Sequence, residues 1–354
     1  MLRRSFITGL AMAELPLGAT ARTADFESHI QPFLAEGFNG TVALGRHGKI
    51  LYSAAFGMAN AETGQKLSRR SRFETGSVSK WLASIIVMKL CDERRLSLDR
   101  PISEYLPDYR RDLGQQLTLR HLLTHSSGLP NQIDPARKSD PAIKTVELDQ
   151  MNAVRRYASG DLAFKPGSAW DYSHSNWILA KAVVERVSGT SYAQLVEQII
   201  IKPLKLRDSG IFHGDSSDIP HMAIGYQTLS PAPLRKPSAI LDYMAMAGGF
   251  YASAEDLVRV MAAVLGSRIL RSDTVQELMR VEMPDQHYAL GPHPHRNHRG
   301  QLRESAWEDR SNSGFRMVAR QVIADGNSVV VMNNTCFDYM RLGALASTLL
   351  DGCY

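Results

Sequence analysis

The sequence predicts an α+β fold, in which helices flank one antiparallel β-sheet and a mostly helical lobe is inserted between its strands. Two observations indicate this fold. Residues 39–57 have the pattern of a β-hairpin, and residues 315–332 have the pattern of two further strands near the other end of the chain. The chain between them has the pattern of helices and loops, so the terminal strands most simply join one sheet. The expected α/β lobe comprises residues 25–100 and 235–354, and the expected helical lobe comprises residues 101–234.

Local signals define the individual elements. Residues 45–48, with a glycine at each end, supply the turn of the hairpin. A short apolar helix is expected to stop at Gly128, and an amphipathic helix is expected to end at Gly189. Ser191 begins the next helix through a capping box, and that helix is expected to stop before Pro203. The same patterns predict helices at residues 176–187, 254–265 and about 339–350, and strands at residues 315–324 and 328–332.

The chain is organised around residues 73–88, where a Ser-x-x-Lys motif opens an apolar helix. Gly76 indicates a turn, and no glycine or proline follows it until Pro101. Ser77 is therefore expected at the N-terminus of a buried helix, with Lys80 one turn further along the same face. In a dry pocket an ammonium group loses its proton more easily, so Lys80 would activate the Ser77 hydroxyl as a nucleophile. The ordinary alternative is a solvated pair on a helix surface.

A second cluster of reactive residues follows a Pro-Gly turn at residues 166–167. Near a cationic Lys80, the Tyr172 phenol would shift toward phenolate and take the Ser77 proton. The alternative is a buried tyrosine that packs the loop. His174 is compatible with three roles, which are capping a helix, binding substrate and relaying protons.

Composition excludes several classes of function. Hydrophobic residues make up 44% of the chain and charged residues 22%, as in an ordinary globular protein. The net charge of +5 is too small and too dispersed to predict a nucleic-acid partner. No apolar run reaches the roughly 18 residues of a membrane span. Cys91, Cys336 and Cys353 form no Cys-x-x-Cys pair, so the sequence does not support a metal or redox motif. We also expect no cofactor.

The N-terminus has the features of an export signal. Arg3 and Arg4 precede an apolar segment in a pattern that resembles a twin-arginine signal, and small residues at positions 18–24 suit cleavage. Glu14 inside the apolar segment fits the alternative, a cytosolic amphipathic N-terminus. We expect residues 1–24 to be an export signal and the protein to be periplasmic, or cytoplasmic if the segment is not a signal.

Several motifs occur together in register along the chain. They are Gly76-Ser77-Val78-Ser79-Lys80, residues 121–130, Pro166-Gly167 with Tyr172-Ser173, Pro203-Leu204, and Ala247-Gly248-Gly249. In this order they resemble the serine β-lactamase-related hydrolases, which include class C β-lactamases, D-alanyl-D-alanine carboxypeptidases and related esterases. The resemblance covers about residues 35–350 and implies a β-lactamase/transpeptidase-like fold. It also implies that Ser77 is acylated and that Lys80 and Tyr172 activate it. His174 replaces the asparagine of the family's Tyr-x-Asn motif.

The third motif of this family departs from its usual form. It consists of Lys or His, then Ser or Thr, then Gly, a few residues before Gly-Phe. Counting back from Phe315 gives a segment that begins at Glu308 and ends at Arg310. The Glu308 carboxylate would repel a substrate carboxylate or pair with Lys80, and Arg310 replaces a glycine that lets substrate approach the backbone. With Ser311 lining the cleft, the backbone N–H groups of this serine and of the nucleophile would form the oxyanion hole.

A second match to this motif, His298-Arg299-Gly300, lies too far from the Gly-Phe pair to serve as well. We expect it in a polar surface loop with His293 and His295 rather than in a metal site.

Together these observations predict a serine hydrolase that acts through an acyl-enzyme on a small-molecule or peptide ester or amide. The predicted catalytic residues are Ser77, Lys80 and Tyr172, and the predicted substrate-binding residues are His174, Glu308, Arg310 and Ser311. The altered third motif favours an ester or an atypical amide over a β-lactam or a D-Ala-D-Ala peptide, and it would weaken activity. The alternative is a binding or sensor protein that kept the cleft and lost turnover.

Overall fold

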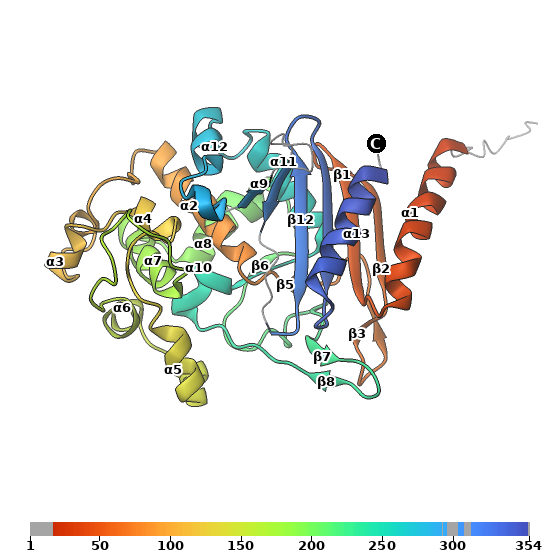
Figure 1. The fold of residues 1–354 in the computed structure, drawn as a ribbon, viewed down its shortest axis with the longest axis horizontal. Coiled ribbons are helices and arrows are strands. Elements are labelled where there is room, and N and C mark those ends of the chain that lie inside the picture. The colour runs from red at the N-terminus through yellow and green to blue at the C-terminus, as the bar shows by residue number, and fades with distance from the viewer. Residues whose placement is uncertain (1–16, 292, 296–303, 308–312, 353–354) are drawn as a thin grey trace, which may run out of the picture.

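A six-stranded antiparallel sheet forms the centre of the computed structural model, which describes residues 17–291, 293–295, 304–307 and 313–352 (Figure 1). The strand order is β10-β11-β12-β13-β1-β2. The strands are β1 (Gly40–Arg46), β2 (Lys49–Phe56), β10 (His293–His295), β11 (Glu304–Trp307), β12 (Arg316–Val322) and β13 (Asn327–Asn333). β1 pairs with β2 in the predicted hairpin and with β13 on its other edge, where Leu44 lies opposite Val329. Strands from both ends of the chain join in one sheet, which confirms the predicted α+β fold.

Helices cover both faces of this sheet, and Figure 1 shows α1 and α13 side by side on one of them. The covering helices are α1 (Leu17–Ala35), α2 (Val78–Asp92), α11 (Ala254–Leu265) and α13 (Tyr339–Gly352). Successive side chains of a strand point to opposite faces. Leu44 and Val329 therefore pack with apolar residues of α1 and α13, whereas Ala43 and Val330 belong to the larger core that contains α2 and α11. The apolar run of β13 follows from burial on both faces.

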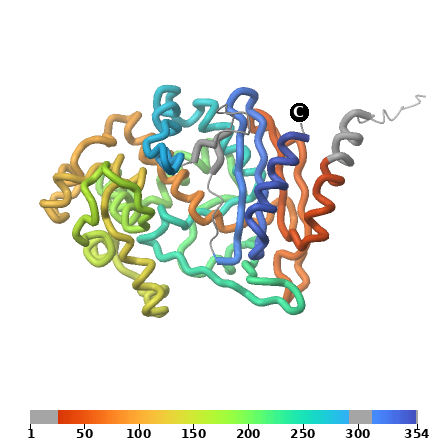
Figure 2. The backbone as a smooth tube through the Cα atoms, in the orientation of Figure 1, coloured from red at the N-terminus to blue at the C-terminus, as the bar shows by residue number. Residues whose placement is uncertain are grey.

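The central helix α2 connects the sheet with the helical part of the chain. Twelve of its side chains are buried, and it packs against α10 and α12. Figures 1 and 2 show the helices of residues 102–188 on the side of α2 away from the main sheet. These helices are η1 (Ile102–Glu104), α3 (Arg111–Gly114), α4 (Leu119–Leu123), α5 (Ile133–Ser139), η2 (Pro141–Thr145), α6 (Gln150–Tyr157) and α7 (His174–Ser188).

Short elements complete the fold. The remaining strands are β3 (Met58–Asn60), β4 (Gln65–Lys66), β5 (Phe73–Glu74), β6 (Gly210–Ile211), β7 (Tyr226–Thr228), β8 (Leu234–Arg235) and β9 (Phe250–Ala252). The remaining helices are α8 (Tyr192–Val196), η3 (Glu197–Ile201), α9 (Lys202–Leu204), η4 (Asp242–Met244), α10 (Ala245–Gly248), α12 (Ser272–Met279) and η5 (Pro284–Gln286). β5, β9 and β6 form a separate three-stranded sheet. Among the described residues, no helix is both long enough and apolar enough to span a membrane.

Two helix ends differ from the predictions. The helix that begins after Ser191 continues past Pro203, because a π-helical turn, η3, connects α8 to α9. Such a turn shifts the hydrogen bonds by one residue and thereby accommodates the proline ring. The helix expected to reach Gly128 ends at α4, where the Thr124 hydroxyl donates to the Arg120 carbonyl. The residue that follows, His125, has a left-handed φ of +58°, which an α-helix cannot continue.

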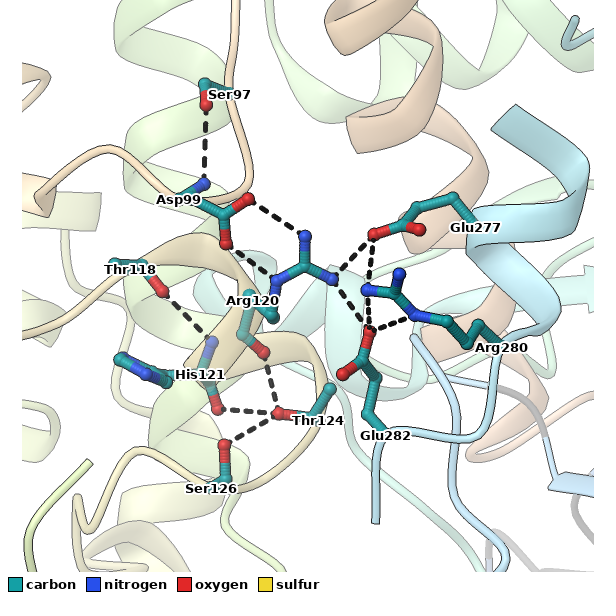
Figure 3. A network of polar contacts seen from close by, with 10 residues as sticks. All are labelled: Ser97, Asp99, Thr118, Arg120, His121, Thr124, Ser126, Glu277, Arg280 and Glu282. Atoms are coloured by element: carbon teal, nitrogen blue, oxygen red, sulfur yellow. Dashed lines mark hydrogen bonds and ion pairs between the residues drawn. The ribbon is translucent and has the colours of Figure 1, made fainter. Parts of the chain in front are cut away.

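Arg120 on α4 holds the helical part of the chain against α12 (Figure 3). Its guanidinium donates to both carboxylate oxygens of Asp99, at 2.6 and 2.9 Å. It also donates to Glu277 at 2.7 Å and to Glu282 at 2.8 Å. The hydrogen bonds from Arg120 to Asp99 lower the pKa of the Asp99 carboxyl. The network fixes α4, which leads directly into the loop that supports the candidate site.

Candidate active site

Ser77 lies between strand β5 and helix α2, and it is the N-cap residue of that helix. Gly76 before it has a φ of +53°, a conformation that glycine adopts without steric cost. The turn is attached to β9, because the Thr75 N–H and hydroxyl both donate to the Phe250 carbonyl at 3.0 Å. In return, the Phe250 N–H donates to the Ser79 hydroxyl at 3.0 Å. These hydrogen bonds fix the chain on both sides of Ser77, which remains partly exposed.

Lys80 lies one helical turn beyond Ser77, and its side chain is fully buried. Its Nζ donates to the Ser77 Oγ at 3.0 Å and to the Ala247 carbonyl at 2.8 Å. The same atom lies 4.9 Å from the centre of the Tyr172 ring. Hydrogen bonds of this kind offset the cost of removing an amine from water. An amine in contact with a serine hydroxyl is positioned to exchange a proton with it.

Tyr172 reaches the same hydroxyl from the loop that precedes α7. Its Oη lies 2.7 Å from the Ser77 Oγ, and its ring stacks on His125 with ring centres 4.4 Å apart. His125 holds the loop on both sides of the tyrosine. The Asp171 N–H donates to the His125 carbonyl at 3.0 Å, and the Ser173 N–H donates to its Nδ1 at 3.1 Å. The structure therefore brings together the three side chains that the sequence predicts to be catalytic.

His174 pairs with a carboxylate that local sequence patterns do not identify. Its Nδ1 lies 2.9 Å from Oδ2 of Asp134 on α5. Burial by itself raises the pKa of Asp134, but the hydrogen bonds from His174 and Asn131 outweigh it, with a contribution from the Arg137 charge. The resulting pKa of Asp134 is about 2. Burial and the charge of Lys80 lower the pKa of His174, although Asp134 acts in the opposite direction. At neutral pH, Asp134 is therefore ionised and His174 is neutral.

A cavity of about 480 Å³ opens onto these groups. Its lining includes Ser77, Tyr172 and His174, together with Asp134 and Arg137 from α5. The last two residues are three positions apart and so lie on one face of that helix. Sequence reasoning missed both, because an acid and a base at this spacing occur on many solvated helices. Only the fold shows that this face of α5 borders the candidate nucleophile.

Three predicted substrate-binding residues, Glu308, Arg310 and Ser311, lie outside the described residues, as does the second motif match at residues 298–300. Their roles stay predictions. The strands on either side, β11 and β12, are adjacent in the main sheet. In the part of the chain that the structure describes, no three His, Cys, Asp or Glu side chains are grouped to hold a metal ion.

Sequence comparisons identify relatives over most of the chain. The Beta-lactamase family model matches residues 26–300. Esterase EstB from Burkholderia gladioli is 31% identical over 276 residues, and the match covers 68% of this chain and 69% of the esterase. The putative penicillin-binding protein PbpX from Bacillus subtilis is 29% identical over 260 residues, and that match covers 73% of this chain and 63% of PbpX.

Solved structures share the fold at lower identity. A D-amino acid amidase from Ochrobactrum anthropi, complexed with L-phenylalanine amide, superposes with a TM-score of 0.79 at 18% identity. That superposition covers 94% of this chain and 98% of the amidase. EstCE1, a hydrolase with promiscuous acyltransferase activity, gives a TM-score of 0.73 at 21% identity, covering 96% of this chain and all of EstCE1. From the family match, the relatives and the fold, we conclude that this chain belongs to the beta-lactamase family of serine hydrolases.

Proposed function

We propose that this serine hydrolase cleaves carboxylic esters through an acyl-enzyme on Ser77, with Lys80 and Tyr172 moving the proton. One observation carries the proposal. The Ser77 Oγ lies within hydrogen-bond distance of both the Tyr172 Oη, at 2.7 Å, and the Lys80 Nζ, at 3.0 Å. A cavity gives substrate access to this serine. Such an arrangement is what an activated nucleophile requires.

Acylation would proceed in two stages. The Ser77 oxygen attacks the ester carbonyl carbon, and its proton passes to the Tyr172–Lys80 pair. The tetrahedral intermediate then collapses, the bond to the leaving alkoxide breaks, and the same pair returns the proton to that oxygen. The Ser77 backbone N–H, at the N-terminus of α2, is suited to stabilise the oxyanion. We propose the Ser311 N–H as the second donor.

The preference for esters has two supports. The predicted third motif begins with Glu308 where the family has a cation, which disfavours substrates that are recognised by a carboxylate. The relative that is 31% identical to this chain is named an esterase. Atypical amides remain the second substrate class, and β-lactams and D-Ala-D-Ala peptides the third.

A small substrate panel tests this proposal. We expect the purified protein to hydrolyse a 4-nitrophenyl butyrate ester faster than a chromogenic cephalosporin or a D-Ala-D-Ala peptide. A fluorophosphonate should label the wild-type protein and should not label Ser77→Ala. A folded wild-type protein that is neither labelled nor active would contradict the proposal and would indicate the binding-protein alternative.

We further propose that residues 1–24 direct export to the periplasm. Helix α1 spans the expected cleavage region, but the apolar side chains that dock it on the sheet include Phe26, Ile30 and Phe33, all beyond residue 24. Cleavage near residue 24 would therefore retain this docking surface. N-terminal sequencing of protein from a periplasmic fraction tests the proposal, and an intact Met1 in the cytoplasmic fraction would contradict it.

A further inference from the structure

Asp134 and His174 form a hydrogen-bonded carboxylate–imidazole pair in the wall of the cavity that contains Ser77. The two side chains keep 36% and 21% of their surfaces exposed, so the pair borders the cavity without being sealed from it. An ionised carboxylate only accepts hydrogen bonds, so the neutral imidazole must carry its proton on Nδ1. The lone pair then lies on Nε2, which receives no hydrogen bond from a described residue.

Charged and titratable groups from three elements face this imidazole. Burial is the largest influence on its pKa, and Lys80 from α2 and Arg137 from α5 also disfavour the protonated ring. Asp134, also on α5, favours protonation. Tyr172, from the preceding loop, meets the ring edge-on with ring centres 5.4 Å apart. The net effect lowers the pKa of His174 below its ordinary value of 6.5, so the ring is an unprotonated base at neutral pH.

Lys80 and Asp134 are less suited than His174 to remove a proton from a water molecule in the cavity. The fully buried side chain of Lys80 is closed to solvent, and its amine is bonded to Ser77 and to the Ala247 carbonyl. The Asp134 carboxylate, whose pKa is about 2, is a weak base. His174 borders the cavity and has an acceptor nitrogen to which no described residue donates.

We propose that His174 is the general base for hydrolysis of the acyl-enzyme, and that Asp134 is a positioning residue that holds the imidazole in the required tautomer. This inference rests on the proposed function, because it needs an acyl group on Ser77.

The step balances with water as the only co-reactant. His174 Nε2 removes a proton from the water molecule while the water oxygen bonds to the acyl carbonyl carbon. The tetrahedral intermediate collapses, the bond between that carbon and the Ser77 Oγ breaks, and the Tyr172–Lys80 pair gives a proton to the serine oxygen. The imidazolium, stabilised by Asp134, releases its proton to solvent, and the Tyr172–Lys80 pair takes one up from solvent, so both groups return to their starting states. The products are the free carboxylic acid and the original hydroxyl.

Pre-steady-state hydrolysis of 4-nitrophenyl butyrate tests the assignment in the full-length protein. His174→Gln should release one nitrophenolate per active site in a burst, and its steady-state rate should then fall about 100-fold or more below wild type. Mass spectrometry of the quenched variant should find the butyryl group on Ser77. The same variant should react with a fluorophosphonate at the wild-type rate, which would show that the nucleophile and the fold are intact.

The positioning role of Asp134 has its own readout. Asp134→Asn removes the charge that favours the protonated imidazole, so the low-pH limb of the kcat profile should move to lower pH. The matched control is Glu147→Gln, which removes one exposed carboxylate outside the cavity and should leave the profile unchanged.

Two results would overturn the base assignment while leaving the proposed function intact. One is wild-type turnover by His174→Gln. The other is an equal loss of the burst and of the steady-state rate in His174→Gln, which would show that His174 is needed for acylation or for folding. A wild-type protein without burst or turnover would instead refute the proposed function, and the base assignment with it.

Discussion

Removing the Tyr172 hydroxyl tests its proposed role in proton transfer while leaving the packing of its ring in place. In Tyr172→Phe the ring can still stack on His125, where the ring centres lie 4.4 Å apart, and only the Oη at 2.7 Å from the Ser77 Oγ is lost. Lys80 still donates to the serine, so we expect folding stability to change by no more than about 1 kcal/mol. Loss of a positioned proton-transfer group should lower kcat/KM for 4-nitrophenyl butyrate about 10²- to 10⁴-fold. That range corresponds to about 3–5 kcal/mol of transition-state stabilisation.

The assay compares kcat/KM with the midpoint of urea unfolding for the same preparation. Tyr109→Phe is the matched control, because it deletes a hydroxyl that donates to the Ala158 carbonyl at 2.7 Å and that lies outside the cavity lining. It should leave kcat/KM unchanged. A Tyr172→Phe variant with kcat/KM within about threefold of wild type would refute the reasoning, because a group that transfers the serine proton is worth far more than that.

Three further predictions concern the surroundings of the site. Arg120→Met should lower the free energy of unfolding at pH 7 by about 1–3 kcal/mol. Arg120 lowers the pKa of Asp99, so its stabilisation is present above the ordinary aspartate pKa and is lost as the pH falls through the lowered value. Urea unfolding should therefore show a smaller difference from wild type at pH 3, and an undiminished difference would contradict this. His125→Phe leaves the buried Ser173 N–H without its acceptor. We expect this substitution to lower the free energy of unfolding by about 1–3 kcal/mol and to lower kcat at least about tenfold. An unchanged kcat would show that His125 does not position the loop. Burial raises the pKa of the Cys91 thiol to about 12, so iodoacetamide at pH 8 should alkylate this cysteine only after the protein unfolds. Peptide mapping would detect the alkylated cysteine, and rapid alkylation of the native protein would contradict the prediction.

Local sequence signals were sufficient for the elements that carry the proposed chemistry. The glycine turn and the apolar run after Ser77 placed the nucleophile at the head of a buried helix. The predicted helix at residues 254–265 matches α11, because a serine cap, two acidic residues in its first turn and a glycine after its end all agree. The hairpin strands β1 and β2 likewise follow from two short, mostly apolar runs on either side of a glycine-containing turn.

Other parts of the site depend on contacts between distant segments. Asp134 and His174 are 40 residues apart and meet only because α5 and α7 border the same cavity. The strands β5, β6 and β9 have two or three residues each, too few to show a periodic pattern. Helix α1 was not predicted, because it contains Pro32 and lacks a strong amphipathic pattern, and it is stabilised by packing against α13 and the sheet.

Detection of an acyl group on Ser77 is the most direct test of the proposed acyl-enzyme. Wild-type protein should be mixed with 4-nitrophenyl butyrate, quenched in acid within the first turnover, digested and analysed by mass spectrometry. We expect a butyryl group on the peptide that contains Ser77, and none on that peptide from Ser77→Ala. Rapid release of nitrophenolate with an unmodified Ser77 peptide, or with the butyryl group on another residue, would contradict the account.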